Sequence, residues 1–143
     1  MEKELIDTGH AWEKDFPFTG GGRAPWTQVA AVRGGRLIFV AGQNAFDDLG
    51  RIIASGRMDL QTQKTYENIV TALKCAGAKL GDIVCERVYV TDIEDYRRWG
   101  GPIRARFFAE AGVTKLPPMT LLGVNRLAHR DHLIEVEVTA VTE

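Results

Sequence analysis

The sequence contains little that would tie the protein to an oxidising compartment. Its two cysteines, Cys75 and Cys85, lack the C-x-x-C spacing of redox and metal motifs. Lone thiols are usual in a reducing cytoplasm, whereas a disulfide scaffold needs several paired cysteines. We therefore expect a cytoplasmic protein and no disulfide framework.

A strong charge of one sign is also absent. The chain has 18 basic and 19 acidic side chains, which are interspersed, and its formal net charge is −1. Nucleic acids and anionic membranes attract a clustered excess of positive charge, which this composition does not provide. The composition therefore favours a small molecule as the partner and argues against nucleic acid.

Long hydrophobic runs are missing too. The longest, such as LIFVAG, have the length of a strand, and the N-terminal MEKELIDTGH has no basic region followed by an apolar one. We expect neither a membrane span nor a signal peptide. With 143 residues, 45% of them hydrophobic, the chain is long enough for one packed core, so a single domain is predicted.

Strand and helix patterns alternate along the chain. Two β-rich runs flank Gly34 and Gly35, which predicts a hairpin with a turn that tolerates positive φ. A helix is predicted from Met58 to Ala76, with Gly77 as its stop, from five apolar residues at helical spacing: Leu60, Tyr66, Ile69, Leu73 and Ala76. The other patterns predict strands at 4–8, 82–92, 119–127 and 132–141, a loop at 12–25, and a helix at 93–112 that is interrupted at 100–102.

This order, βββαβαββ, predicts an α/β protein of the α+β type in which two helices cover one face of a mixed sheet. In the last strand one apolar side should meet the helices; it consists of Ile134, Val136, Val138 and Ala140. The strand at 119–127 has apolar residues on both of its sides. A second apolar sheet face predicts an oligomer, and the alternative is a moderately exposed sheet face.

Two short motifs are better explained by structure than by chemistry. GGGR, residues 20–23, lacks the Lys-Ser/Thr that completes a phosphate-binding loop, so a plain loop is favoured. In HRDH, the residues His129, Asp131 and His132 provide too few ligands for zinc, and no distant pair completes the set. A solvated hairpin turn is favoured there, and no metal is predicted.

The second predicted helix is rich in charged residues. Asp92, Glu94 and Asp95 are most simply explained as caps of its first turn. Its basic residues are expected on a solvated face, and the alternative is that one of them holds a ligand carboxylate. These residues are Arg97, Arg98, Arg104 and Arg106.

Two carboxylates, Glu135 and Glu137, lie inside the last strand among β-branched residues. A carboxylate on a sheet face is either paired, here with Arg87 or Arg126, or available as a proton acceptor. Pairing is the somewhat better expectation, and the second reading stays open.

Several segments occur in the order that is typical of a known family. They are GGRLIFVAGQ, a helix with QTQKTYENIVTALKCAG, GDIVCERVYVTDIEDY, FF, a proline-led strand and LIEVEVTA. Together they resemble the Rid family of reactive intermediate deaminases, also called YjgF-like proteins, over residues 25–142. The resemblance implies a chorismate-mutase-like fold and a homotrimer with sheets around a central barrel and ligand clefts between subunits. Residues 1–143 would then be one domain, with an N-terminal strand and loop at 1–25 and a core at 26–142.

The resemblance also implies a reaction. The best-known members hydrolyse imines or enamines derived from amino acids to a keto acid and ammonia, without a cofactor. In them an arginine directly after Pro-Ala grips the substrate carboxylate. Here Met119 holds that position, after two prolines and before Thr120. Glu137 matches the glutamate that is thought to handle water or a proton.

Other matched positions differ from the family as well. Trp26 takes the place of a cleft tyrosine, Ala41 that of the serine in Ser-Gly-Gln, and Gly100 lies on or near the place of an asparagine. With Met119, these residues predict a less polar cleft that prefers an apolar or uncharged ligand. The expected function is hydrolysis of a small imine, enamine or related C–N compound, with poor activity on ordinary 2-imino acids.

Two alternatives remain open at this point. One is a non-catalytic trimer that binds or senses a small molecule, and the other is a structural partner of another protein. Whether Arg97, Arg104 or Arg126 replaces the missing arginine is also open.

Overall fold

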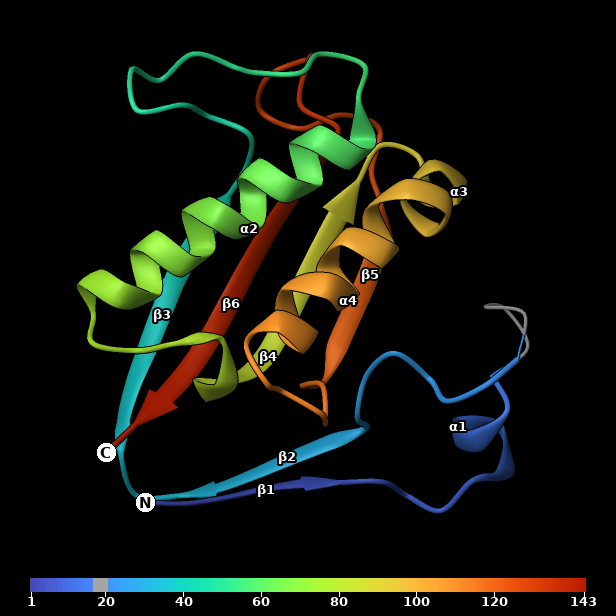
Figure 1. Cartoon of the computed structure of the whole chain (residues 1–143), viewed down its shortest axis with the longest axis vertical. Helices are drawn as coiled ribbons and strands as arrows, with labels where there is room; N and C mark the ends of the chain where they lie inside the picture. The colour runs from blue at the N-terminus through green and yellow to red at the C-terminus, as the bar shows by residue number, and fades with distance from the viewer. Residues whose placement is uncertain (17–20) are drawn as a thin grey trace.

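The computed structural model places a mixed sheet against two helices, with a separate pair of strands beside them (Figure 1). It describes residues 1–16 and 21–143, so part of the loop predicted at 12–25 lies outside the described residues. The strands are β1 Glu2–Ile6, β2 Val29–Arg33, β3 Arg36–Gln43, β4 Ile83–Val90, β5 Met119–Gly123 and β6 Ile134–Thr142. The helices are α1 Ala11–Lys14, α2 Met58–Cys75, α3 Ile93–Asp95 and α4 Gly101–Glu110, with a 3-10 turn η2 at Leu80–Asp82 and a π-turn η3 at Tyr96–Gly100.

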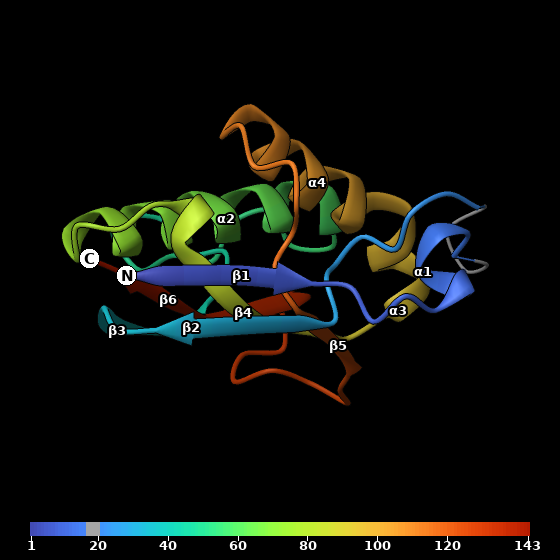
Figure 2. The same ribbon diagram turned by 90° about the horizontal axis from the view of Figure 1, so that it is seen from below.

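The main sheet has the strand order β3-β6-β4-β5. Strand β6 runs antiparallel to its neighbours β3 and β4, whereas β4 and β5 are parallel. Helices α2 and α4 lie on the same face of this sheet (Figures 1 and 2). The predicted α+β fold, a mixed sheet with two helices on one face, is therefore confirmed.

The core lies between that face and the helices. The predicted apolar side of β6 is confirmed, because Ile134, Val136, Val138 and Ala140 are at most 3% exposed. Helix α2 begins at the predicted Met58, ends one residue before the predicted Ala76, and buries Tyr66, Ile69 and Leu73. Leu60, predicted for the same side, is 44% exposed. Gln61 is buried instead, because its amide binds the backbone of three separate residues: Ile53, Asp131 and Leu133.

The predicted hairpin around Gly34 and Gly35 is wrong. The turn has the expected positive φ at both glycines, but β2 pairs antiparallel with β1 and belongs to a second sheet (Figure 2). The turn instead packs against the end of β6: a Cβ on Gly35 would lie 2.5 Å from the carbonyl oxygen of Thr142. The glycines therefore carry the chain from one sheet to the other.

The last two strands do not form a hairpin either, because β4 lies between β5 and β6. The HRDH segment belongs to the connection that crosses from one to the other. His129 is exposed, but His132 is only 1% exposed, and its ring meets Phe46 edge to face with the centroids 4.7 Å apart. The expected solvated turn is thus wrong for His132, because the crossing connection carries it into the interior.

The second predicted helix continues through its glycines instead of breaking. The Asp92 side chain accepts a hydrogen bond of 2.9 Å from the N–H of Asp95, which confirms the predicted cap. The π-turn η3 then joins α3 to α4, and Pro102 lies in the first turn of α4, where proline is best tolerated. Gly100 is buried in this turn: a Cβ there would lie 2.5 Å from the ring of Tyr96 and 2.8 Å from Oγ1 of Thr62.

Gly100→Ala is therefore expected to destabilise the protein by about 1–3 kcal/mol, because the added methyl group overfills a packed site. Gly101→Ala is the matched control, since its nearest neighbour, the carbonyl oxygen of Tyr96, lies 3.6 Å from the added Cβ. The control should be neutral or stabilising, as alanine favours helix more than glycine does. Urea unfolding of both variants measures the difference, and equal stabilities would contradict the packing role of Gly100.

Candidate functional site

An open cleft of about 630 Å³ lies between the edge strand β5 and the helical segment α3–η3–α4. The N-terminal part of the chain supplies its third wall. Among the described residues that line it, most are apolar, two are arginines and none is acidic. We call it the aromatic cleft, and its lining is Phe16, Pro25, Trp26, Ile93, Tyr96, Arg97, Gly101, Pro102, Arg104, Ala105, Met119, Thr120 and Leu121.

Strand β5 provides the strand wall of the aromatic cleft. In its parallel register with β4, Met119 lies beside Glu86 and Leu121 beside Val88. Because Glu86 and Val88 are buried under the helices, Met119 and Leu121 point to the helix side and Thr120 to the open side. The carbonyl of Pro118 accepts a hydrogen bond of 2.9 Å from the N–H of Glu86, which sets where β5 begins. The two prolines therefore do aim Met119 into a cleft.

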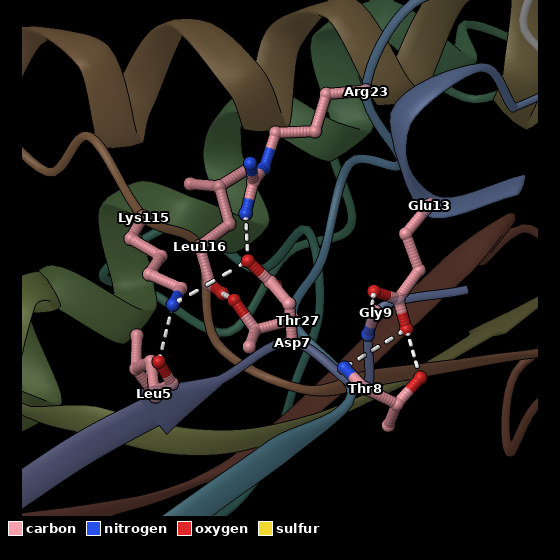
Figure 3. Close-up of polar contacts among 9 residues, drawn as sticks. All are labelled: Leu5, Asp7, Thr8, Gly9, Glu13, Arg23, Thr27, Lys115 and Leu116. Carbon is pink, nitrogen blue, oxygen red and sulfur yellow. Dashed lines mark hydrogen bonds and ion pairs between the residues drawn. The ribbon is translucent and has the colours of Figure 1, made fainter. Parts of the chain in front are cut away.

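Trp26 forms part of the N-terminal wall. Its ring meets that of Phe16 edge to face, with centroids 4.9 Å apart at 81°. The next residue, Thr27, donates its N–H (3.1 Å) and its hydroxyl (2.6 Å) to the carbonyl of Leu116, which lies just before β5 (Figure 3). Trp26 is thus held close to the start of the strand that carries Met119.

Charged side chains fasten the N-terminal segment at the same place (Figure 3). The carboxylate of Asp7 accepts a hydrogen bond from Arg23 and lies 3.6 Å from Nζ of Lys115. The hydrogen bond from Arg23, with the charges of both cations, lowers the pKa of Asp7. Glu13 accepts a hydrogen bond from the hydroxyl of Thr8, which lowers the pKa of Glu13. Both carboxylates therefore stay ionised at neutral pH and hold this wall in place.

A buried ion pair lies behind the helical wall. Arg104 is 2% exposed, and its Nε donates to Oε2 of Glu86 over 2.9 Å, as does its Nη2. The hydroxyl of Tyr66 donates to the other oxygen, Oε1, over 2.9 Å. Nη1 of Arg104 donates to the carbonyl of Pro25 over 2.8 Å. One carboxylate thus joins β4 to α2 and α4, and Arg104 extends the link to the residue before Trp26.

The expectation that Arg104 lies on a solvated face is wrong. Glu86 faces the helices like Val88 and Val90 of the same strand, and a buried carboxylate requires a cation beside it. Burial alone would lower the pKa of Arg104, but the charge of Glu86 outweighs it and raises this pKa. Burial also raises the pKa of Tyr66, and Glu86 adds to the effect. The guanidinium of Arg104 is therefore bound to Glu86 and to the carbonyl of Pro25, although Arg104 also lines the aromatic cleft.

Glu137 lies in a smaller hollow of about 330 Å³ on the face of the sheet away from the helices. We call it the Glu137 hollow; its lining is Phe39, Val40, Ala41, Arg87, Glu137, Val138 and Thr139. Nη1 of Arg87 donates to Oε1 of Glu137 over 2.9 Å, and the hydroxyl of Tyr89 donates to the same oxygen over 3.1 Å. The predicted pairing with Arg87 is confirmed. Among the described residues nothing donates to Oε2, so this oxygen can receive a proton or a water.

The predicted site residues thus fall in two places. Trp26, Met119 and Thr120 line the aromatic cleft, whereas Ala41 and Glu137 line the Glu137 hollow. The cleft lies at the β5 edge of the sheet, and the hollow is formed by β3, β6 and β4. Gly100, also predicted, lines neither and is buried. A single site that unites these residues stays a prediction.

Two of the arginines considered as replacements for the family's carboxylate-binding arginine have different surroundings. Arg97 lines the aromatic cleft, whereas Arg126 lines neither cavity and donates to the carbonyls of Leu127 and Ala128. Glu86 was not predicted as part of the site, although a charged residue on the apolar side of IVCERVYV is a signal for a buried ion pair. Phe16 was not predicted either, and the sequence offers no comparable signal for it.

Two further findings concern only residues 1–16 and 21–143. Within these ranges no group of three or more His, Cys, Asp or Glu side chains is arranged to hold a metal ion. Nor does any helix in them combine the length and the apolar character needed to cross a membrane.

Fold and site together define a class, the YjgF-like α+β proteins with a ligand-sized cleft at the sheet edge. The family model described as Endoribonuclease L-PSP matches residues 21–142, and the chain belongs to this family, which confirms the resemblance to Rid proteins. A RutC family protein from Pyrococcus abyssi is 35% identical over the whole of both chains. The 2-iminobutanoate/2-iminopropanoate deaminase of Salmonella typhimurium is 32% identical over 79% of this chain and 85% of that protein.

Solved structures agree with this assignment. A Rid family protein from Yersinia pestis, YyfB, described as of unknown function, superposes with a TM-score of 0.82 at 26% identity and covers 99% of this chain and all of that one. TdcF from E. coli with bound serine has a TM-score of 0.69 at 29% identity, over 84% of this chain and 90% of that one.

Replacing Arg104 tests the buried ion pair. Arg104→Met leaves the Glu86 carboxylate buried without its cation, so we expect the free energy of unfolding to fall by about 3–5 kcal/mol. Arg106→Met is the control, because Arg106 is half exposed and its ion pair with Glu110 has a distance of 3.7 Å. It should change stability by less than about 0.5 kcal/mol. Denaturant unfolding measures the difference. Similar losses in both variants would show that the buried pair contributes no more to the free energy of unfolding than the exposed one.

Proposed function

We propose that the protein hydrolyses a small reactive imine, enamine or related C–N compound, without a cofactor, in a cleft between subunits of a homotrimer. The observation that carries this proposal is the geometry of Glu137, which is held at Oε1 by Arg87 and Tyr89 while Oε2 remains available. The activity named for the Salmonella relative supports the reaction class. A cytoplasmic location, where such intermediates are formed and lone thiols are stable, is part of the proposal.

Hydrolysis of a C=N bond requires one positioned carboxylate from the protein. Water adds to the carbon of the C=N bond, and Glu137 accepts a proton from this water. The carboxyl group returns this proton to the nitrogen, which gives a carbinolamine. Glu137 then moves the proton of the new hydroxyl group to the amine, the C–N bond breaks, and ammonia leaves a carbonyl compound behind. Burial and the hydrogen bond to Glu137 raise the pKa of Tyr89, so its hydroxyl remains a donor at neutral pH and keeps the carboxylate oriented.

Met119 is the reason to expect poor activity on ordinary 2-imino acids. An arginine at this place would bind a substrate carboxylate through charge-assisted hydrogen bonds that contribute on the order of 1.5–3 kcal/mol. The thioether of Met119 offers only a weak acceptor and no donor. Binding of a small 2-imino acid at this position should therefore be weaker by about tenfold or more.

The homotrimer is supported by how one chain distributes its site residues. The aromatic cleft lies at the β5 edge, and the Glu137 hollow lies on a different part of the sheet. In the proposed trimer a neighbouring subunit brings the two together. Contacts between different surfaces of identical chains close into rings. The open sheet face also exposes large apolar side chains, with Leu37 at 59% and Phe39 at 77%. Such side chains favour burial against another copy of the chain.

The alternative is a trimer of the same kind that binds or senses a small molecule without catalysis. The direct ion pair with Arg87 favours it, because one oxygen of the carboxylate is already bound to a guanidinium. For either function we propose a small molecule and not RNA, since the net charge of −1 offers no attraction for a polyanion.

Catalysis is tested with freshly generated 2-aminoacrylate, followed by pyruvate release. We expect a slow rate for the unmodified protein and a gain of about tenfold or more for Met119→Arg, because the new guanidinium binds the carboxylate. In the Met119→Arg background, Glu137→Gln should abolish turnover. Glu135→Gln, a change to the neighbouring carboxylate on the same side of β6, should leave most of it. An unchanged rate for Glu137→Gln would show that Glu137 is structural, whereas no turnover by either the unmodified protein or Met119→Arg would favour the non-catalytic alternative.

The assembly is tested by light scattering, with an expected mass of three times the 15.8 kDa chain. Phe39→Asp places a charge on the open sheet face and should reduce the mass toward that of one chain. Leu49→Asp is the matched control, since Leu49 is 76% exposed but lies in the connection between β3 and α2. A monomeric mass for the unmodified protein would rule out the trimer.

A further inference from the structure

We propose that His132 is a pH-sensitive latch for the connection between β5 and β6. While its ring is uncharged, His132 holds residues 124–132 against the rest of the chain, and protonation of the ring releases this connection. The proposal does not rest on hydrolysis, since His132 lines neither the aromatic cleft nor the Glu137 hollow.

His132 is the anchor of this connection. Among residues 124–132 it is the only buried one, and the others are exposed or half-buried. Its ring packs edge to face against that of Phe46, in the connection from β3 to α2. Gln61 of α2 fixes the backbone on both sides of His132. Its amide donates to the carbonyl of Asp131 over 2.7 Å and accepts from the N–H of Leu133 over 2.8 Å. Between the two strands, the connection is thus attached to the interior at one place.

The imidazole of His132 has no hydrogen-bond partner among the described residues. Its Nδ1 and Nε2 are both buried and unpaired. Most buried polar atoms in proteins are paired, so an unpaired group of this kind requires an explanation. A neutral imidazole loses only its hydration here, whereas an imidazolium would be a buried charge with two unsatisfied donors, which costs far more. The interior therefore accepts this ring in its uncharged form only.

The charged groups near His132 do not remove this penalty. The rings of His129 and His132 have centroids 6.1 Å apart, and a charge on one opposes a charge on the other. Asp131 acts in the opposite direction, but its side chain is half exposed and lies 3.8 Å from Nδ1 of His129. Gln61 and Phe46, which meet this segment from other parts of the chain, carry no charge. Burial is the largest effect and lowers the pKa of His132.

The sign of the pH effect follows from this lowered pKa. When the connection is open, the ring of His132 is in water and titrates near the ordinary histidine value of about 6.5. The closed form binds a proton less readily, so its stability is complete above about pH 6.5 and is lost as the pH falls below this value. Each opening takes up at most one proton at His132. The ratio of closed to open connections therefore falls by up to about tenfold per pH unit.

Release of the connection acts on two neighbouring elements. The connection follows β5 directly, and Gly123 at the end of β5 packs against Ile93 of α3. At the other end of the connection, the carbonyl of Leu133 accepts a hydrogen bond of 3.0 Å from the N–H of Thr91, just before α3. Both β5 and α3 contribute to the lining of the aromatic cleft. Acidification therefore removes a restraint at the place where these two walls meet.

Amide hydrogen exchange of the full chain, followed by NMR between about pH 7.5 and about pH 5, tests the latch. The reporter is the N–H of Leu133, whose protection factor is corrected for the intrinsic pH dependence of exchange. It should fall by up to about tenfold per pH unit below about pH 6.5. It should also be smaller than that of Ile69 in the core, because a connection opens before the whole chain unfolds. Titration of the ring signals should place the pKa of His132 below the ordinary histidine value.

Three variants assign the effect to one ring. His132→Phe removes the titrating group and keeps a flat ring beside Phe46, so the protection of Leu133 should no longer fall with pH. His132→Leu should give the same result with a smaller side chain. His129→Phe is the matched control, because it removes an exposed imidazole from the same connection and should keep the fall.

Four results would overturn the proposal. The first is that the protection of Leu133 in the unmodified protein does not change with pH. The second is that His132→Phe and His132→Leu both keep the fall, which would assign it to another group. The third is that Leu133 exchanges as slowly as Ile69 at every pH, which would mean that the connection opens only when the whole chain unfolds. The fourth is a pKa of His132 at or above the ordinary histidine value.

Discussion

A carboxylate buried beneath two helices is the constraint on which the rest of this structure depends. Removing Glu86 from water costs several kcal/mol unless donors surround it, so Tyr66 and Arg104 must stay in place. These contacts connect β4 to α2 and α4, and Arg104 also reaches the carbonyl of Pro25. The helical and N-terminal walls of the aromatic cleft are therefore attached to one guanidinium. The position of the cleft follows from the need to neutralise one charge in the core.

The two cavities differ in the chemical groups that line them. Apolar contact and positive charge gather at the β5 edge, and a carboxylate with one available oxygen lies on the open face of the sheet. The open face that carries Glu137 also exposes Phe39. In the trimer proposed above, association would bury this apolar surface next to the carboxylate.

Local features of the fold could be predicted from the sequence, whereas the pairing of the strands could not. The bounds of α2, the cap at Asp92 and the buried side of β6 depend on residues within a few positions of each other. The two expected hairpins failed because β1 pairs with β2 and β4 lies between β5 and β6. Nearby strands are the simplest partners for each other, and the sequence contains no local sign that a distant strand will take that place.

The amino-acid sequence by itself determined the element types, the family and the presence of Met119 where an arginine was expected. Periodicity and motif order carry this information, because both are properties of neighbouring residues. Only the tertiary structure decided that Arg104 is buried while Arg97 lines the cleft, although the two share one helical segment. The reason is that burial of a charge depends on a partner from elsewhere in the chain. Glu86 on β4 provides one for Arg104, whereas Arg97 has an exposed partner and remains at the cleft.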